Sequence, residues 1–342
     1  MSCPKVFIII LNWNRLQDTL ECLESVSKLN YEDFEVVVVD NGSSDDSVAT
    51  IRRNYPLTTI LENKENLGYT GGNNIGIQYA MGNGADYVWL LNNDAVVDLD
   101  TLAKLVDEAE RFPTIGLVSP VIYYYDNPDK IQFMGAYADF AKNVIANIEE
   151  PNELDNNWVQ RYLVLWGTAL FIKRNVIESI GYLSERYFAY WEDIDYSLRA
   201  LRKHFQTKVR LDARILHKDS RSSGKQSPFQ VFLKTRNHYF LWRDNLQGLK
   251  RIFALCHYIG MVIGAAKNQS DKGNEISFDA CLNGAWAAFL GKGGAYDQTI
   301  VIPSWLKTVF RFFGSWHPYF WVCLFNGNFR GIVRRTLTWA QH

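Results

Sequence analysis

Short runs of apolar, mostly β-branched residues recur through the first 121 residues of this chain, and segments of helical periodicity separate them. The runs lie at residues 6–11, 34–39, 58–61, 87–91 and 115–121. Runs of this length and composition are typical of strands that are covered on both faces. Because strands and helices alternate, we predict a mostly parallel sheet with helices on both of its faces.

Helices are expected between these strands. Apolar residues recur at helical spacing between residues 16 and 29, and a second helix is predicted to follow Ser43 and Ser44 as its N-caps. Further helices are expected at 73–81 and 102–109. These elements predict an α/β fold class.

The second half of the chain is less regular. Residues 122–163 pass from a Tyr-rich start to an acidic, Asn-rich stretch, and we interpret them as an excursion over the sheet. A strand at 163–172, a helix at 190–204 and a strand at 208–217 then return to the earlier pattern. From about residue 245 the composition becomes aromatic, basic and helical, which indicates a separate C-terminal segment.

Composition excludes several classes of protein. Of the 342 residues, 47% are hydrophobic and 21% charged, which is typical of a folded chain, and a formal net charge of −1 gives no reason to expect nucleic acid as a partner. The five cysteines are scattered without a CxxC pair, so we expect a reducing compartment and neither a disulfide framework nor a structural zinc site. The apolar run at 252–266 is shorter than the roughly 20 residues of a spanning helix. We therefore predict a cytoplasmic protein that does not span a membrane.

Polar residues follow successive predicted strands. Asn12 and Asn14 come after the first strand, Asp40 ends the second, Asn66 and Gly68 follow the third, and Asp94 ends the fourth. In a parallel sheet these ends meet at one edge, where open α/β sheets bind ligands. A carboxylate such as Asp40 can accept the ring N–H of uracil or thymine, and one such as Asp94 can hold a divalent cation against a diphosphate. The alternative for residues 40–43 is a turn followed by a helix cap.

Common nucleotide-binding loops are absent from the sequence. There is no GxxxxGK[ST], and the glycines at 68, 71, 72 and 76 do not match GxGxxG. A Rossmann dehydrogenase is therefore unsupported.

Seven motifs in order resemble family 2 glycosyltransferases, which are inverting enzymes of GT-A fold, and in particular their rhamnosyltransferase-like branch. The motifs are ILNWN, VVVVDNGSSDDS, NLGYTGGNNIGI, LLNNDAVV, WGTALFIKR, YWEDIDYSLRALRKH and LHKDSRSSG. The resemblance covers residues 5–245. It implies a GT-A catalytic domain at 1–244, with a nucleotide-sugar half at about 1–121 and an acceptor half at about 122–244. Residues 245–342 form the C-terminal segment.

The resemblance also implies a donor pocket. It assigns Asp40 to the base, and its nucleotide-sugar contacts comprise Asn12, Asn14, Asn66, Gly68 and Asn73. Asn92, Asn93 and Asp94 become the counterpart of the family's Asp-x-Asp motif, with an amide in place of the first acid. Asp94 and His217 are the implied ligands of Mn²⁺ or Mg²⁺, and imidazole suits manganese better than calcium.

The acidic pair at 192–193 is the implied centre of the chemistry. By resemblance Asp193 is the base that takes the proton of the acceptor hydroxyl, while Glu192, Trp191 and Trp166 shape the acceptor side. The alternative is that both acids only favour the dipole of the helix that they begin. Asp195 and Arg199 have the spacing of a helix-surface pair.

The loop after His217 holds three cations, Lys218, Arg221 and Lys225. It is expected either to close over the diphosphate as a lid or to be a solvated loop. The last 42 residues, 301–342, contain eleven aromatic residues and five Lys or Arg but no acid. This composition is typical of a segment at a membrane interface, and the alternative is a packed lobe or a dimer contact.

These features predict a metal-dependent inverting glycosyltransferase for surface polysaccharide synthesis. It would move a sugar, with rhamnose as one candidate, from a UDP- or dTDP-sugar to a hydroxyl of a glycan or lipid-linked glycan. A membrane surface is a further expected partner, at the inner face. The alternatives are a non-catalytic nucleotide- or glycan-binding relative and a sugar nucleotidyltransferase, although the Gly-rich, Arg-containing loop of the latter is missing after the first strand.

Overall fold

The computed structural model describes residues 3–218 and 227–315, and these residues divide into two compact units. The first unit holds residues 3–139 and 144–218, and the second holds 140–143 and 227–315. Each unit is described by itself. Helix α8 (Pro228–Asn245) belongs to the second unit by its packing, while the functional boundary at residue 244 stays a prediction.

The first unit is built on one large mixed sheet. Among its described residues nine strands run in the order β3–β2–β1–β4–β11–β6–β12–β5, with β7 paired to β6. The strands are β1 (Val6–Asn12), β2 (Phe34–Asp40), β3 (Thr59–Glu62), β4 (Tyr87–Asn92), β5 (Ala95–Val97), β6 (Ile115–Tyr124), β7 (Asn127–Phe133), β11 (Ala169–Lys173) and β12 (Gln206–His217). The four strands β3, β2, β1 and β4 are parallel, and β11 joins them antiparallel to β4.

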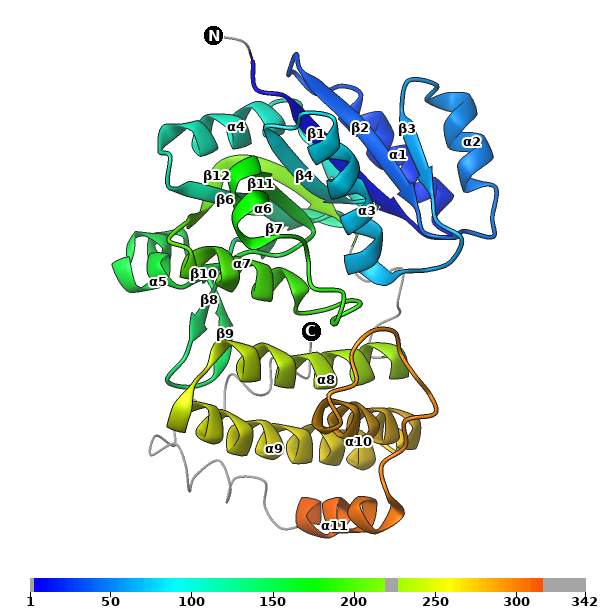
Figure 1. Ribbon diagram of the computed structural model, residues 1–342, viewed down its shortest axis with the longest axis vertical. Helices are drawn as coiled ribbons and strands as arrows, with labels where there is room; N and C mark the ends of the chain where they lie inside the picture. Colours follow the sequence, from blue (N-terminus) through cyan, green and yellow to red (C-terminus); the bar gives the residue numbers. More distant parts are fainter. Residues whose placement is uncertain (1–2, 219–226, 316–342) are drawn as a thin grey trace. The chain divides into compact units, whose positions relative to one another are not determined.

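Helices pack on this sheet as the alternation predicts (Figure 1). Those that contact its strands are α1 (Leu16–Val26), α3 (Gly68–Gly82), α4 (Thr101–Arg111), α6 (Arg174–Ile180) and α7 (Glu192–Arg202), while α2 (Ser47–Asn54) packs against α1. On one face of the sheet, Ile9 and Val39 pack with Ile77 of α3 in the main core. A Cβ at Gly76 would lie 2.5 Å from Ile9 Cγ2, so this glycine allows α3 to approach the sheet closely.

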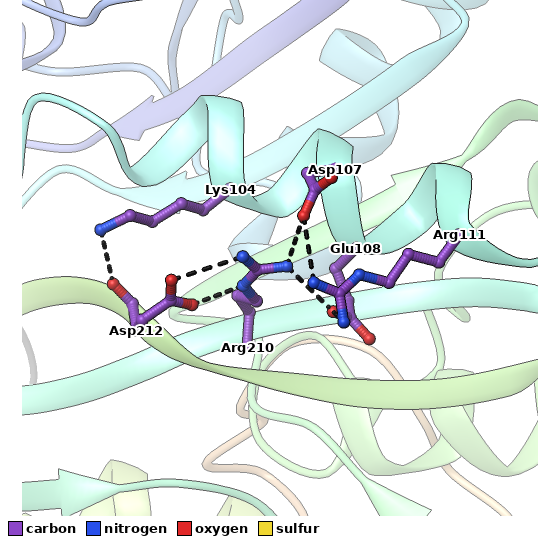
Figure 2. Close-up of polar contacts among 6 residues, drawn as sticks. All are labelled: Lys104, Asp107, Glu108, Arg111, Arg210 and Asp212. Atoms are coloured by element: carbon purple, nitrogen blue, oxygen red, sulfur yellow. Dashed lines mark hydrogen bonds and ion pairs between the residues drawn. The ribbon is translucent and has the colours of Figure 1, made fainter.

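Helix α4 is attached to β12 by a network of charges (Figure 2). Arg210 of β12 lies 2.6 Å from Asp107 and 3.2 Å from Glu108, and it also pairs with Asp212. Lys104 donates a hydrogen bond of 2.8 Å to the carbonyl of Asp212. The Arg210 side chain is only 15% exposed. Its single guanidinium links the strand to two carboxylates of the helix.

The excursion predicted at residues 122–163 contains regular structure. Besides β7, it includes β8 (Ala136–Asp139), β9 (Val144–Asn147), a 3₁₀ turn at Pro151–Asp155 and α5 (Asn157–Arg161). The continuous strand predicted at 163–172 is wrong. Residues Leu163–Val164 form β10 in a three-stranded sheet with β8 and β9, and the chain then crosses to β11 in the main sheet.

Two predicted helix starts are also wrong. Helix α2 begins at Ser47, and Ser43 instead accepts hydrogen bonds from the Asn14 amide and the Asn12 side chain. Helix α3 begins at Gly68, five residues before the predicted start. Gly68 has a φ of +73°, and its amide donates to Asn66 Oδ1, so a polar side chain outside the helix stabilises this early turn.

The second unit is helical. It contains α8, α9 (Gly248–Asp271), α10 (Glu275–Phe289) and α11 (Ser304–Ser315). Tyr258, Val262, Phe278 and Leu282 are at its core. Helix α9 is a continuous helix of 24 residues, which corrects the shorter apolar segment expected from the sequence. By length and composition alone it is long and apolar enough to cross a membrane, although one third of its most apolar stretch is buried within the unit.

Candidate active site

The parallel register places three predicted site residues side by side. Asn12 at the end of β1 is paired with Asp40 of β2, and Leu11 is paired with Asn92 of β4. Asn12 Nδ2 donates to Asp40 Oδ1 at 2.8 Å, and the other Asp40 oxygen accepts from the Ser43 amide at 2.9 Å. The carboxylate of Asp40 is thus buried and oriented by two donors. Ionised carboxylates have about four acceptor sites, so it keeps acceptor capacity for a ligand.

A hydroxyl that the sequence did not single out extends this row. Thr19 of α1 donates to Asn12 Oδ1 at 2.7 Å and accepts from Asn93 Nδ2 at 2.8 Å. Asp40, Asn12, Thr19 and Asn93 therefore form a chain of hydrogen bonds along the edge of the sheet. The turn alternative does not account for this chain, because it connects Asp40 to a third strand end.

Asn41 is a second residue that the sequence analysis missed. Its Nδ2 donates to Asn66 Oδ1 at 2.9 Å and to the Gly68 carbonyl at 3.0 Å. The predicted donor residues Asn66 and Gly68 are therefore joined to the end of β2. The Asn73 side chain donates to the Tyr69 carbonyl within the same helix. Asn14 lies at the exposed edge, where its Oδ1 accepts from the Ser44 amide at 2.7 Å.

Asp94 and His217 are in contact, as the metal prediction requires. His217 Nε2 lies 3.1 Å from Asp94 Oδ1 and 3.4 Å from Asn92 Nδ2, and both Asp94 and His217 are more than 90% buried. Burial alone would raise the pKa of the Asp94 carboxyl, but the hydrogen bond from His217 and the nearby positive charge outweigh it and lower that pKa. Across the described residues, no group of three or more His, Cys, Asp or Glu side chains gathers to hold a metal.

Lys218 is not in a solvated loop. It is buried, and its Nζ lies 2.7 Å from Asp18 and 2.6 Å from Glu21, two acids of α1, while its amide donates to the Asp94 carbonyl at 3.1 Å. The lysine therefore fixes the chain directly after His217. Arg221 and Lys225, the other cations of the predicted lid, lie outside the described residues.

Asp193 lies in the first turn of helix α7, and backbone amides hold its carboxylate. Its Oδ2 accepts from the Gly167 amide at 2.8 Å, and its Oδ1 from the Ile194 amide at 2.7 Å. Tyr69 of α3 donates to the Gly167 carbonyl at 2.6 Å. Burial raises the pKa of Asp193, and these hydrogen bonds oppose the rise.

Glu192 is adjacent to Asp193, but its carboxyl group has a different hydrogen-bonding environment. Its Oε2 is buried without a hydrogen-bond partner among the described residues. Burial, followed by the charges of Asp193 and Asp195, raises the pKa of Glu192 well above its usual range. Two adjacent carboxyl groups thus have different environments: the raised pKa of Glu192 favours its protonated form, and the hydrogen-bonded Asp193 is the easier one to ionise.

One dipeptide joins the two halves of the site. Gly167 donates to Asp193, and the carbonyl of the next residue, Thr168, accepts from the Asn92 amide at 2.9 Å. The strand end that carries Asp94 and the helix start that carries Asp193 are therefore connected through two consecutive residues. The structure brings together the predicted donor, metal and base residues at one edge of the first unit.

The two tryptophans predicted on the acceptor side differ in their structural environment. Trp191 directly precedes α7 with a φ of +75°, and Phe188 and Tyr190 also have positive φ. Three non-glycine residues in this region of backbone space store strain of a kind found at functional sites. Trp166 stacks on Phe133 of β7, with ring centroids 4.0 Å apart.

The loop before α7 is fastened to the start of α3. The Phe188 carbonyl accepts from the Thr70 amide at 3.1 Å, and a Cβ at Gly68 would lie 2.5 Å from the same oxygen. Only glycine fits there. Asp195 and Arg199 form the predicted ion pair at 2.9 Å, but Asp195 is buried and Arg199 also donates to the carbonyls of residues 180 and 182.

Several relatives with sequence similarity are glycosyltransferases. The chain is 27% identical over 219 residues to galactofuranosyltransferase GlfT1 of Mycobacterium tuberculosis, which covers 62% of this chain and 69% of the relative. It is 25% identical over 248 residues to the N-acetylglucosaminyl-diphospho-decaprenol L-rhamnosyltransferase of the same species, covering 66% and 80%. A hexosyltransferase of low-salt glycan biosynthesis, Agl10 of Haloferax volcanii, is 25% identical and covers 68% and 73%.

Solved structures share the fold. The mannosyltransferase PcManGT from Pyrobaculum calidifontis, in complex with GDP-Man and Mn²⁺, has a TM-score of 0.53 at 17% identity and covers 93% of this chain and 83% of its own. S. aureus TarS 1-349 with UDP-GlcNAc has a TM-score of 0.55 at 17% identity, covering 83% and 81%. The profile described as "Glycosyl transferase family 2" matches residues 7–181, about half of the sequence. This chain therefore belongs to glycosyl transferase family 2 and has the GT-A fold.

Proposed function

We propose that this glycosyltransferase is a metal-dependent inverting enzyme that moves a sugar from a UDP- or dTDP-sugar to a hydroxyl of a glycan, in surface polysaccharide synthesis. The observation that carries the proposal is the Gly167–Thr168 connection. It joins a carboxylate–imidazole pair suited to a cation to a buried, amide-held carboxylate suited to a base. Rhamnose is one candidate sugar, in keeping with the rhamnosyltransferase among the relatives.

The donor would lie along the edge formed by β1, β2 and β4. In this proposal Asp40 accepts the ring N–H of the base, while Asn12, Asn14, Asn66 and Gly68 surround the nucleotide. Asn73 is included in the proposed set on the basis of the motif alone, because its side chain already donates a hydrogen bond within α3. Uracil and thymine present the same N–H, so Asp40 is compatible with both.

The residues present fit a divalent cation. Asp94 offers a carboxylate oxygen and His217 an imidazole nitrogen, a donor set that suits Mn²⁺ and Mg²⁺. Asn92 and Asn93 contribute amides but no charge, so the remaining ligands would come from the diphosphate and water. A loaded site would neutralise the charge that develops on the departing diphosphate.

Asp193 is the proposed base. Inverting transfer requires one group that takes the proton of the acceptor hydroxyl as this attacks the anomeric carbon. The amides of Gly167 and Ile194 orient both oxygens of Asp193, and burial raises its pKa toward the working range of a base. Glu192, which holds its proton, can donate a hydrogen bond to the acceptor, and Trp191 and Trp166 are the proposed acceptor-side surfaces.

We place the enzyme in the cytoplasm at the inner face of the membrane, with a glycan or lipid-linked glycan as acceptor. The name of one relative includes a diphospho-decaprenol acceptor, which supports this choice. Membrane contact by residues 301–342 stays a prediction, and residues 316–342 lie outside the described part of the chain.

The products of the reaction distinguish this proposal from its alternatives. The full chain is incubated with Mn²⁺ and each of several UDP- and dTDP-sugars, with and without a glycan acceptor. Release of UDP or dTDP that depends on the acceptor supports a glycosyltransferase. Pyrophosphate released from a nucleoside triphosphate and a sugar 1-phosphate would identify a nucleotidyltransferase. Donor binding without release of any product would identify a non-catalytic relative.

A further inference from the structure

The first turns of α9 expose an apolar row. Leu249, Ile252 and Phe253 are 72%, 58% and 54% exposed, and their i, i+3, i+4 spacing places them on one side of the helix. The opposite side is buried against the neighbouring helices through Ala254, Tyr258 and related positions. The second unit therefore leaves large apolar side chains uncovered beside a well-packed core, an arrangement that marks an interaction surface.

A pocket adjoins this row. Its volume is about 290 Å³, near the lower end of the roughly 300–1,000 Å³ range of ligand pockets. It lies between α8 and α9, which are neighbours within the second unit (Figure 1). Its lining includes Trp242, Leu255, Tyr258, Ile252, Arg243 and Arg251. Because Ile252 belongs to both features, the pocket and the exposed row are continuous.

The charges at this place are positive. Lys250 and Arg251 are exposed, and within the described part of the chain neither of them makes an ion pair. Arg243, on the α8 side of the pocket, lies 2.7 Å from Asp244, which partly balances its charge. Two unbalanced cations thus adjoin the three exposed apolar side chains in the first turns of α9, and Arg251 lies on the pocket side of the helix. Cations beside apolar side chains match a surface of anionic headgroups over hydrocarbon.

We propose that this surface, formed by the first turns of α9 and the facing part of α8, docks on a bilayer that contains anionic phospholipid. Leu249, Ile252 and Phe253 enter the interface, while Lys250 and Arg251 contact lipid phosphates. The pocket between Trp242 and Leu255 receives part of one lipid, with Arg243 and Arg251 beside its phosphate. The site is separate from the proposed tail contact and does not depend on the proposed reaction.

Charge argues against two other occupants. Residues 316–342 contain Arg330, Arg334 and Arg335 and no acid, so Lys250 and Arg251 would repel this segment. A second copy of the chain, related by a two-fold axis, would place the same cations face to face. An anionic bilayer satisfies both the cations and the apolar row.

The test is vesicle flotation of the full chain. Neutral phosphatidylcholine vesicles are compared with vesicles that contain phosphatidylglycerol, at low and high salt. The variant Lys250→Ala/Arg251→Ala should bind the anionic vesicles roughly 30-fold more weakly, because each cation near the surface contributes roughly fivefold. The variant Ile252→Ser/Phe253→Ser should bind the anionic vesicles roughly tenfold or more weakly at every salt concentration. Salt does not screen the apolar contribution to binding.

Matched controls come from the same unit. Lys272→Ala removes an exposed cation at the other end of α9, and Ile276→Ser removes a side chain that is 71% exposed on α10. Both should bind within about twofold of the unchanged chain. Circular dichroism confirms that each variant is folded.

Three outcomes would overturn the proposal. The first is equal binding of neutral and anionic vesicles, and the second is unchanged binding by both double variants, which would assign any lipid contact to another part of the chain. The third is a change of oligomeric state in Ile252→Ser/Phe253→Ser, by light scattering, with unchanged vesicle binding. That result would identify the row as an interface between copies of the chain.

Discussion

Gln132 Oε1 lies 2.8 Å from His217 Nδ1, while Nε2 of the same ring faces Asp94. An amide oxygen only accepts hydrogen bonds, so this contact keeps a hydrogen on Nδ1. Nε2, which donates to Asp94, is then the nitrogen that would bind a metal once it has given up its own hydrogen. Gln132 is in β7, within the segment that the sequence suggested was an excursion. A strand paired to the edge of β6 therefore orients a proposed ligand at the end of β12.

Gln132→Leu should weaken Mn²⁺ binding in the presence of UDP by about 10–100-fold, the usual cost of losing a residue that orients a metal ligand. Gln132→Glu keeps an acceptor at the same place and should restore most of the affinity. Lys130→Leu, at an exposed position of the same strand, is the control. Electron paramagnetic resonance of free Mn²⁺ measures the affinity directly, and equal affinities for the Leu and Glu variants would contradict the role of Gln132.

Asp94→Ala should weaken Mn²⁺-dependent binding of UDP or dTDP more than His217→Ala does, because Asp94 carries the charge. The lowered pKa of Asp94 keeps it ionised at neutral pH, so this ranking should hold throughout the physiological range. Asp98→Ala, an exposed acid just after β5, should bind as the unchanged chain does. Calorimetric titration with and without a chelator gives the affinities. If neither Asp94→Ala nor His217→Ala changes them, the metal has no place in the mechanism.

Asp193→Asn should retain donor binding while sugar transfer falls by about 10²–10⁴-fold, the usual contribution of a positioned base. Asp195→Asn tests the alternative that acids in the first turn of α7 serve only the helix dipole. This second variant should lower thermal stability through loss of the Arg199 pair but keep most of the transfer rate. Equal rates for Asp193→Asn and the unchanged enzyme would remove Asp193 from the role.

Glu192 should make stability depend on pH. Its folded-state pKa is raised, so above the unfolded pKa of about 4.3 the unfolded chain releases a proton that the folded chain keeps. The free energy of unfolding should therefore fall as pH rises from about 4.3, and Glu192→Gln should remove this loss. Urea unfolding at about pH 4.5 and 7.5 gives the free energies of unfolding. Relative to the unchanged chain, the variant should be more stable at about pH 7.5 than at about pH 4.5. The exposed Glu65→Gln should show no such gain.

Arg210→Met should destabilise the first unit by about 1–2 kcal/mol, since one partly buried guanidinium serves several carboxylates. Arg111→Met, at the exposed side of the same network, should cost less than about 0.5 kcal/mol. Hydrogen bonds from Arg210 lower the pKa of Asp107 and Asp212. The difference between Arg210→Met and the unchanged chain should therefore be constant at pH 5–7 and shrink below about pH 4.

The sheet was predictable from the sequence because the runs of β1, β2 and β4 are almost wholly apolar, and the polar residues at their ends were then expected to meet. The start of α3 was not predictable. Glycine is a poor helix former, and the groups that favour Gly68 there include Asn66 and a carbonyl 120 positions away.

Two of the missed site residues, Thr19 and Gln132, belong to no motif. Each gains its role from a partner distant in sequence, as Gln132 does from His217. Lys218 was expected in a loop that was either a lid or solvated, and its burial could not be predicted for the same reason, because its acids on α1 lie about 200 positions earlier. Local patterns contain no information on such pairs.

Because the Phe188 carbonyl contacts Gly68, the two segments that carry these residues cannot be exchanged independently of each other. An engineer who grafts another enzyme's loop in place of residues 184–191 to change the acceptor must also supply a carbonyl for the Thr70 amide. A new loop with its carbonyl at the place of the Phe188 carbonyl also requires glycine at position 68. Changing the proposed acceptor side is thus best done by exchanging both segments together.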